Sequence, residues 1–266
     1  MSSIRTLLPF TLLTLFCLYY FSSSIHNASH DLWDWLAVTA KPPDFSHYAP
    51  SPHTLSAREF PIDHPHKRVL VVGDIHGMHD PLQALLDKLD YNPASDVLVH
   101  VGDIVAKGPH HGSLAILDFM SRNNVTGVRG NHDQMVVEWR AWLNWITALD
   151  GGAVWLNNLH AAEEEADPDD PEKWAEKYLK RHTKRKWRTR IPKGWSMLSD
   201  HYRIARDMTP SHFAYMLSLP LVLHAPEAHV LIAHAGILPL RPALQTIAPA
   251  PTPRARPVPP QQPRPW

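Results

Sequence analysis

Four short segments of the chain carry side chains that divalent metal ions accept as ligands. Each segment follows an apolar run, and the candidate ligands are Asp74 and His76, Asp103, Asn131 with the adjacent His132, and His234. Two metal ions about 4 Å apart can acidify a water molecule and bind phosphate oxygens, which is what hydrolysis of a phosphate ester or anhydride needs. Such a pair needs one carboxylate shared between the ions, with histidine, aspartate and asparagine at the other positions. The four segments in this order therefore predict a two-metal site for phosphate hydrolysis.

The positions of these segments predict how the fold brings them together. The apolar runs before them have the pattern of buried strands, at Val69–Val72, Val97–Val101, Val125–Val128 and Val230–Ala233. Glycines next to three of the segments allow a sharp turn from strand to loop, so the ligands can converge on one rim. Helices are expected between the strands, one with Asp80 as N-cap and Pro81 at its first position, and another over 113–122. Strands that alternate with helices place the core in the α/β class.

The motifs GDIHG, GDIVAKGP, GNHD and HAG resemble the successive motifs of the calcineurin-like metallophosphoesterases, over about 69–239. The resemblance implies a β-sandwich flanked by helices, of the α/β or α+β class, with a two-metal site at the strand ends. By motif, Asp74 and His76 would bind the first metal, Asp103 would bridge, and Asn131 and His234 would bind the second. The ions would be manganese, zinc, iron or cobalt, because mixed nitrogen and oxygen ligands do not select one of them.

The resemblance also assigns roles beside the metals. His132 would donate a proton to the leaving oxygen, a role that suits imidazole as a general acid. The adjacent Asp133 is expected to help to orient His132. Lys107 and Arg129 are expected to bind the phosphate groups of the substrate. The predicted catalytic residues are therefore His132 and Asp133, with two basic residues for the substrate.

The second motif distinguishes between subfamilies. Ser/Thr phosphoprotein phosphatases resemble this chain but read GDxVDRG there, so Ala106 and Lys107 stand in place of an aspartate and an arginine. Without the aspartate, the catalytic histidine lacks the partner that it has in those phosphatases. Lysine in place of arginine replaces a planar guanidinium, which can donate two parallel hydrogen bonds, by a compact ammonium group. GDIVAKGP with GNHD is more similar to the symmetrical diadenosine tetraphosphatases and to membrane-anchored fungal vacuolar endopolyphosphatases. We therefore expect a phosphoanhydride hydrolase acting on inorganic polyphosphate or a dinucleoside polyphosphate, with a phosphoprotein phosphatase as the alternative.

One ligand expected from the resemblance has no counterpart in the chain. The family supplies another metal-binding histidine well after the HAG segment, whereas the last histidine here is His234. Water or a distant residue would have to replace it, or the C-terminal part of the domain is missing. His224 and His229 precede the HAG strand and are poor substitutes by order. A non-catalytic relative that binds phosphate is therefore a further alternative.

Composition limits the remaining possibilities. The 266 residues can form one domain with tails, and 26 acidic side chains balance 26 basic ones, which argues against a nucleic-acid partner. Cys17 is the single cysteine, so an intrachain disulfide and a thiolate metal cluster are both excluded. The expected partner is a phosphate-containing small molecule or polyphosphate. The oligomeric state does not follow from the sequence.

The N-terminal segment predicts a membrane partner. Arg5 precedes an apolar run over 6–21, slightly short for a span of roughly 20 residues and slightly long for a signal-peptide core. We expect 1–24 to be a signal anchor or a cleaved signal peptide. The positive flank favours a single-pass protein with a luminal catalytic domain, with secretion as the alternative. The resemblance to vacuolar endopolyphosphatases implies a vacuole-like compartment. Sequons at Asn27 and Asn124 fit that compartment.

The rest of the chain divides by composition. A flexible stalk is expected over 25–65, the metallophosphoesterase domain over 66–245 and a Pro-rich disordered tail over 246–266. Within the domain, 134–225 is expected to be a helical insertion that begins with regularly spaced tryptophans, which we expect to pack in the core. The basic block over 177–193 is interpreted as a solvated helix face, or alternatively as an attractor for a polyanionic substrate.

Overall fold

The structure is a computed structural model, which describes residues 42–46, 52–165 and 170–236. The predicted membrane segment and the Pro-rich tail lie outside these residues. Within the described ranges, no helix is both long enough and apolar enough to cross a membrane. The chain divides into two units, 1–234 and 235–266, and the helices and strands described below belong to the first.

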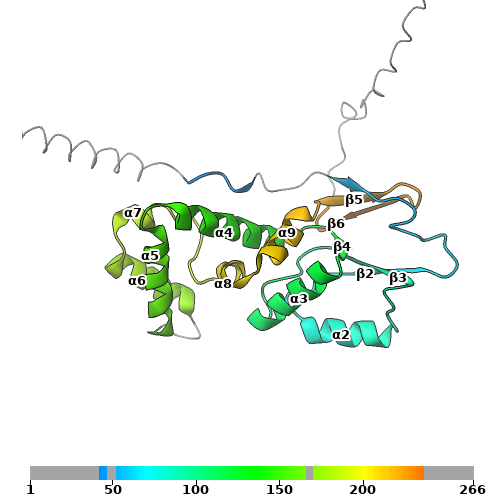
Figure 1. The fold of residues 1–266 in the computed structure, drawn as a ribbon, viewed down its shortest axis with the longest axis horizontal. Coiled ribbons are helices and arrows are strands. Elements are labelled where there is room, and N and C mark those ends of the chain that lie inside the picture. Colours follow the sequence, from blue (N-terminus) through cyan, green and yellow to red (C-terminus); the bar gives the residue numbers. More distant parts are fainter. Residues whose placement is uncertain (1–41, 47–51, 166–169, 237–266) are drawn as a thin grey trace, which may run out of the picture. The chain divides into compact units, whose positions relative to one another are not determined.

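In the first unit, strands and helices alternate from β2 to α4, after which helices follow one another up to α9 (Figure 1). In chain order the elements are β1 (His53–Thr54), β2 (Arg68–Val72), α2 (His79–Lys88), β3 (Asp96–His100), α3 (His110–Arg122), β4 (Thr126–Gly127), α4 (Asn131–Ala148), α5 (Gly152–Ala162), η2 (Glu163–Glu165), α6 (Pro171–His182), α7 (Arg185–Arg188), α8 (Asp200–Asp207), α9 (Pro210–Ser218), β5 (Val222–Ala225) and β6 (Val230–Ala233). The predicted mixed α/β class is confirmed.

The first sheet is parallel and has the strand order β2-β3-β4. Val69 pairs with Val97, and the register continues until Val72 lies opposite His100. On its other side, His100 pairs with Gly127 of β4. Because the strands are parallel, their carboxyl ends lie at the same edge of the sheet. The loops that carry the predicted ligands therefore begin side by side.

The second sheet has the order β1-β5-β6, with β1 parallel to β5 and β5 antiparallel to β6. Leu223 and Ile232 from this sheet share a buried aliphatic cluster with Val99 of β3 and Val128. The two sheets therefore pack against each other through apolar side chains, as the strands of a sandwich do. This packing carries His234, which follows β6, to the end of β3.

A larger core lies among the helices. Trp139 and Trp142 of α4 are 2% and 0% exposed, and Trp145 packs against the same cluster while partly buried. The indole nitrogen of Trp142 donates to the carbonyl of Arg190 at 2.9 Å, so its polar atom has a partner inside the core. The expected packing role of the tryptophans is confirmed.

The two helices before β5 begin at capping residues that the sequence provides. Ser199 accepts a hydrogen bond from the backbone N–H of Tyr202 ahead of α8. Thr209 accepts one from the N–H of His212 ahead of α9. These side chains satisfy N–H groups that have no partner within the helix, which fixes where each helix begins.

The predicted beginnings of two earlier helices are wrong. Helix α2 begins at His79 rather than Pro81, so Asp80 lies within its first turn and is not the N-cap. Pro81 is tolerated there because N–H groups of the first turn have no intrahelical acceptor. The carboxylate of Asp80 instead contacts His79 Nδ1 at 3.0 Å. Helix α3 begins at His110, three residues before the predicted start.

Candidate metal centre

Two loops that follow adjacent strands of the parallel sheet are bonded to each other. The backbone N–H groups of Ile75 and His76 donate to the carbonyl of Asp103 at 3.0 and 2.9 Å. The N–H of Gly77 donates to the carbonyl of Ile104 at 2.9 Å. Because these bonds join the loop after β2 to the loop after β3, the side chains of both loops keep a fixed separation.

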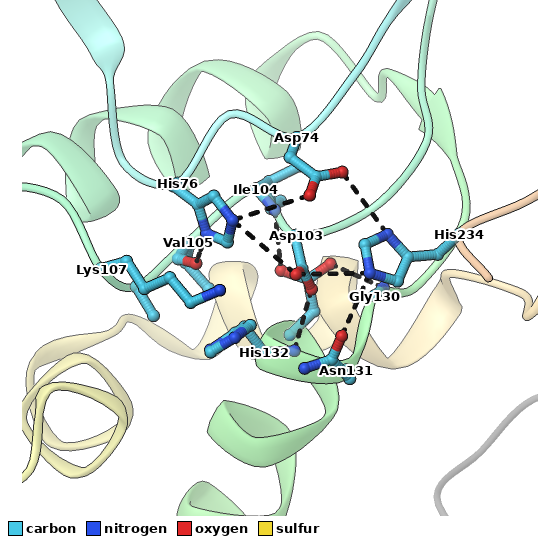
Figure 2. Close-up of polar contacts among 12 residues, drawn as sticks. Asp74, His76, Asp103, Ile104, Val105, Lys107, Gly130, Asn131, His132 and His234 are labelled. Atoms are coloured by element: carbon cyan, nitrogen blue, oxygen red, sulfur yellow. Dashed lines mark hydrogen bonds and ion pairs between the residues drawn. The ribbon is translucent and has the colours of Figure 1, made fainter.

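The first group of potential ligand atoms comes from Asp74, His76 and Asp103 (Figure 2). His76 Nε2 lies 3.7 Å from Asp74 Oδ2 and 3.9 Å from Asp103 Oδ2. One ligand atom from each residue lies within 4.8 Å of the others, which suits a single ion bound to each at roughly 2 Å. The residues predicted for the first metal are therefore brought together.

A second group lies on the other side of Asp103 and consists of Asp103, Asn131 and His234 (Figure 2). His234 Nε2 lies 3.3 Å from Asp103 Oδ2 and 3.1 Å from Asn131 Oδ1. Asp103 Oδ2 therefore belongs to both groups. A single oxygen between two sets of ligands is the position predicted for the bridging carboxylate.

Backbone carbonyls orient both histidines of the two groups. His76 Nδ1 lies 3.4 Å from the carbonyl of Val105, and His234 Nδ1 lies 3.0 Å from the carbonyl of Val101. A carbonyl can only accept, so each Nδ1 carries the proton and each Nε2 directs its lone pair toward the carboxylates. This tautomer is the one that binds a metal through Nε2. The donor atoms present therefore fit divalent metal ions.

The orientation of Asp103 depends on the turn that precedes α4. Asp103 Oδ1 accepts a hydrogen bond from the backbone N–H of His132 at 2.9 Å, which leaves Oδ2 to face the two ligand histidines. Gly130 lies against the same carboxylate, and a Cβ atom at this position would overlap Asp103 Oδ1. The φ angle of Gly130, −82°, can be adopted by any residue. Glycine is therefore needed at this position because the backbone lies too close to Asp103 for a side chain, and not because of its φ angle.

Asp133 stabilises this turn and does not contact the ring of His132. Its carboxylate is completely buried and accepts from the backbone N–H groups of Gly130 at 2.9 Å and Ile104 at 3.0 Å. Burial raises the pKa of Asp133 to about 6, although the hydrogen bond from Gly130 opposes this shift. Both oxygens are thus used by the backbone, and the predicted orientation of His132 by Asp133 is not supported.

The ring of His132 lies beside the first ligand group. Its centroid is 5.4 Å from that of His76, with the two ring planes at 84°. His132 Nδ1 lies 2.7 Å from Nε2 of His201 in α8, a contact that the sequence analysis missed. Burial lowers the pKa of His132, and the carboxylate of Asp103 opposes this shift. His201 is one of 19 histidines and stands outside the four motifs, so its sequence context does not distinguish it.

The two basic residues predicted to bind phosphate occupy different environments. Lys107 is exposed, and its side chain extends toward the space between His76 and His132 (Figure 2). Arg129 is 2% exposed, and its guanidinium donates to two carbonyls in the last turn of α9 at 2.6 and 2.8 Å. These contacts tie α9 to the start of α4. The predicted contact of Arg129 with substrate is not supported by this geometry.

Left-handed backbone is concentrated in the two ligand loops. The φ angles of His76, Asp103, Ala106 and Lys107 are 47°, 48°, 70° and 63°. Residues other than glycine rarely adopt this region, and doing so costs on the order of 1–3 kcal/mol each. The hydrogen bonds between the loops hold this conformation, together with a bond from the N–H of Lys107 to Asp200 Oδ2 at 2.6 Å.

Known proteins resemble the part of the chain that carries these loops. The model of the calcineurin-like phosphoesterase family matches residues 67–238. Serine/threonine-protein phosphatase 1 of Salmonella typhimurium is 40% identical over 103 residues, which cover 38% of this chain and 47% of that protein. A symmetrical bis(5'-nucleosyl)-tetraphosphatase of Haemophilus ducreyi is 51% identical over 65 residues, or 24% of this chain and 23% of that protein. The chain thus spans less than half the length of these curated relatives.

A solved structure also resembles the chain. It is described as a candidate diadenosine tetraphosphatase and is 24% identical, with a TM-score of 0.44. The match covers 73% of this chain and 59% of that one.

Proposed function

Because the chain belongs to the calcineurin-like phosphoesterases, a family of metal-dependent proteins, we propose that it hydrolyses phosphoanhydrides with the help of two divalent metal ions. The observation that carries this proposal is the shared oxygen of Asp103. Its Oδ2 lies 3.9 Å from His76 Nε2 on one side and 3.3 Å from His234 Nε2 on the other. One carboxylate oxygen between two imidazoles suits two ions about 4 Å apart.

Two sets of residues would hold the ions. Asp74 and His76 would bind one ion, Asn131 and His234 would bind the other, and Asp103 would bind both. When bound, the ions supply Lewis acidity for the attack of water on phosphorus. Nitrogen and oxygen ligands of this kind suit manganese, zinc, iron or cobalt.

Side chains beside the ligands would act on the substrate. His132 Nε2 would donate a proton to the leaving oxygen as its bond to phosphorus breaks. The contact of Nδ1 with His201 at 2.7 Å leaves Nε2 as the nitrogen for this transfer. Lys107, which extends toward the same space, would bind a phosphate oxygen through its ammonium charge (Figure 2).

We favour inorganic polyphosphate or a dinucleoside polyphosphate as the substrate. An anhydride of this kind carries further phosphates beside the reacting one, and Lys107 offers a cation to one of them. The 51% identity to a symmetrical bis(5'-nucleosyl)-tetraphosphatase over 65 residues supports the same class. Ala106 also supports a phosphoanhydride substrate. It is completely buried, and the phosphoprotein phosphatases that resemble this chain have aspartate at this position.

A phosphoprotein phosphatase is the second candidate function. The observation in its favour is the 40% identity to serine/threonine-protein phosphatase 1 over 103 residues, a longer match than the tetraphosphatase gives. The substrate would then be a phosphorylated serine or threonine side chain. The same metal ligands and His132 would serve both reactions.

The two candidates differ in the substrate that is cleaved faster. The full-length chain would be incubated separately with manganese, zinc, iron and cobalt, and given long polyphosphate, diadenosine tetraphosphate or a panel of phosphopeptides. We expect the anhydrides to be cleaved faster, as shortened polyphosphate on a gel or as released nucleotides. Faster release of phosphate from the phosphopeptides would support the second candidate.

The Asp103→Asn variant tests the bridging role. We expect it to lose turnover with every metal while keeping its far-ultraviolet circular dichroism, because the amide offers one oxygen and no charge. Retained turnover would contradict the role of Asp103. Intact substrates with the folded wild-type chain and all four metals would indicate a phosphate-binding relative without catalysis.

We also propose that residues 6–21 anchor the chain in a membrane and that the catalytic unit is luminal. The exposed side chain of Asn124, within the sequon that ends at Thr126, is accessible to glycosylation there. Full-length protein should stay in the membrane pellet after alkaline extraction and lose mass on glycosidase treatment. Release by alkaline extraction would contradict the anchor, and an Asn124→Gln variant with an unchanged glycan mass would contradict modification at this site.

A further inference from the structure

Helix α8 brings His201 to the ring of His132, although the two residues are 69 positions apart in the chain. We propose that His201 is a positioning residue, which fixes the ring of His132 through Nδ1 and leaves Nε2 for the substrate. This inference rests on the proposed function, in which His132 protonates the leaving oxygen. The helical segment between β4 and β5 would then help to orient the general acid, because α8 carries His201.

The contact has the geometry of an end-to-end hydrogen bond. The nitrogen atoms lie 2.7 Å apart, and the planes of the two rings differ by 16°. The ring centroids are 5.0 Å apart, nearly twice the nitrogen–nitrogen distance, so the rings meet at their edges and do not stack face to face. A bond in the plane of both rings restricts rotation of His132 about its side-chain torsions.

The residues on either side of His201 anchor it to the ligand loops and to the helical core. Asp200 Oδ2 accepts a hydrogen bond from the backbone N–H of Lys107 at 2.6 Å, which joins the start of α8 to the loop after β3. The hydroxyl of Tyr202 lies 2.6 Å from His160 Nε2, and Tyr202 is completely buried. A positioning residue needs this kind of support, because a mobile side chain cannot hold its neighbour.

The hydrogen bond also defines where the protons lie during catalysis. In the protonated, acid form of His132 both ring nitrogens carry protons, so Nδ1–H donates to His201 Nε2, and His201 carries its own proton on Nδ1. The protonated His132 then gives the proton on Nε2 to the leaving oxygen as the bond from that oxygen to phosphorus breaks. His132 ends neutral with Nδ1 still protonated. His201 neither gains nor loses a proton, so its role is to orient the acid.

Leaving groups of different basicity separate a positioning role from a structural one. The full-length chain with manganese would be given phenyl phosphate, whose leaving oxygen needs a proton, and p-nitrophenyl phosphate, whose leaving group departs as an anion. His201→Ala should lower kcat for phenyl phosphate roughly 10- to 100-fold and kcat for p-nitrophenyl phosphate less than about threefold. His201→Gln should restore part of the loss, because its amide oxygen can accept from Nδ1.

His160→Ala is the matched control. It removes another histidine that holds α8, through Tyr202, but has no contact with His132 among the hydrogen bonds of the described residues. This variant should lower kcat for both substrates by the same factor or leave both unchanged. Equal losses on both substrates in His201→Ala, or no loss on either, would overturn the proposal.

A measurement without turnover separates this inference from the proposed function. Nitrogen-15 spectra of the histidine rings in the metal-free full-length chain should show a hydrogen-bonded Nδ1 for His132, and His201→Ala should change this resonance. An unchanged His132 resonance would overturn the proposed contact, whatever the activity. A wild-type chain that hydrolyses neither these esters nor polyphosphate nor diadenosine tetraphosphate, with a His132 resonance that responds to His201→Ala, would refute the proposed function and support the contact.

Discussion

The buried imidazole of His100 makes the stability of the fold depend on pH. His100 is 0% exposed, and its Nδ1 accepts from the backbone N–H of Gly102 at 3.3 Å. Its Nε2 lies 2.8 Å from the hydroxyl of Tyr215, which itself donates to the carbonyl of Val125 at 2.8 Å. Both contacts suit the neutral ring, because a second proton on Nδ1 would face the N–H of Gly102.

The size of the effect follows from the difference in pKa between the folded and unfolded chain. Burial lowers the pKa of His100 from 6.5 to about 3. Between these values the unfolded state binds a proton that the folded state does not. The free energy of unfolding therefore falls as the pH decreases below 6.5. From about pH 7.5 to about pH 5, this single group accounts for a loss of about 2 kcal/mol.

Urea unfolding of the wild type and of His100→Gln tests this expectation. Both would be followed by tryptophan fluorescence at about pH 7.5 and about pH 5, with a chelator present so that release of metal from histidine ligands does not contribute. The glutamine does not titrate, so the wild type should lose about 2 kcal/mol more than the variant between the two pH values. A parallel loss in both proteins would refute the reasoning, because it would mean that His100 accepts a proton in the folded state.

Two further predictions concern the helical core and the turn before α4. Trp142→Ala should lower the free energy of unfolding by about 3–5 kcal/mol because the indole is 0% exposed, and Trp145→Ala should lower it less, as measured by urea unfolding. Equal losses in the two variants would contradict the assigned packing. Gly130→Ala should lower manganese affinity in equilibrium dialysis roughly tenfold or more, since its Cβ would displace Asp103, whereas Gly73→Ala, with open space around it, should not. Unchanged affinity in Gly130→Ala would show that Asp103 is not a ligand.

The convergence of the proposed metal ligands could be predicted from the sequence because each one follows a strand with a strong local pattern. Parallel pairing then brings the loops after β2 and β3 together without further information. The positions of His76 and Asp103 therefore follow from strand order alone. His234 required in addition that the second sheet pack on the first, which the resemblance to a sandwich supplied.

His201 could not be predicted, because its contact depends on how α8 packs on α4. That packing rests on tertiary contacts such as the hydrogen bond from the guanidinium of Arg140 to the carbonyl of Ala205 at 3.0 Å. Arg129 was misinterpreted for a related reason. Its position in the RGNHD segment suggested a phosphate ligand, but a cation beside the last turn of a helix can also satisfy free carbonyls. The sequence around Arg129 does not distinguish these two uses.

The left-handed residues of the ligand loops have a consequence for how this protein can evolve. The proposed roles of His76, Asp103 and Lys107 need their side chains, but Ala106 could be replaced by glycine, which adopts its φ angle of 70° without strain. Such a change would loosen the loop that carries Asp103, because glycine also permits many other conformations. Replacing Ala106 by glycine would therefore relieve backbone strain and give up part of the fixed spacing between the proposed ligands.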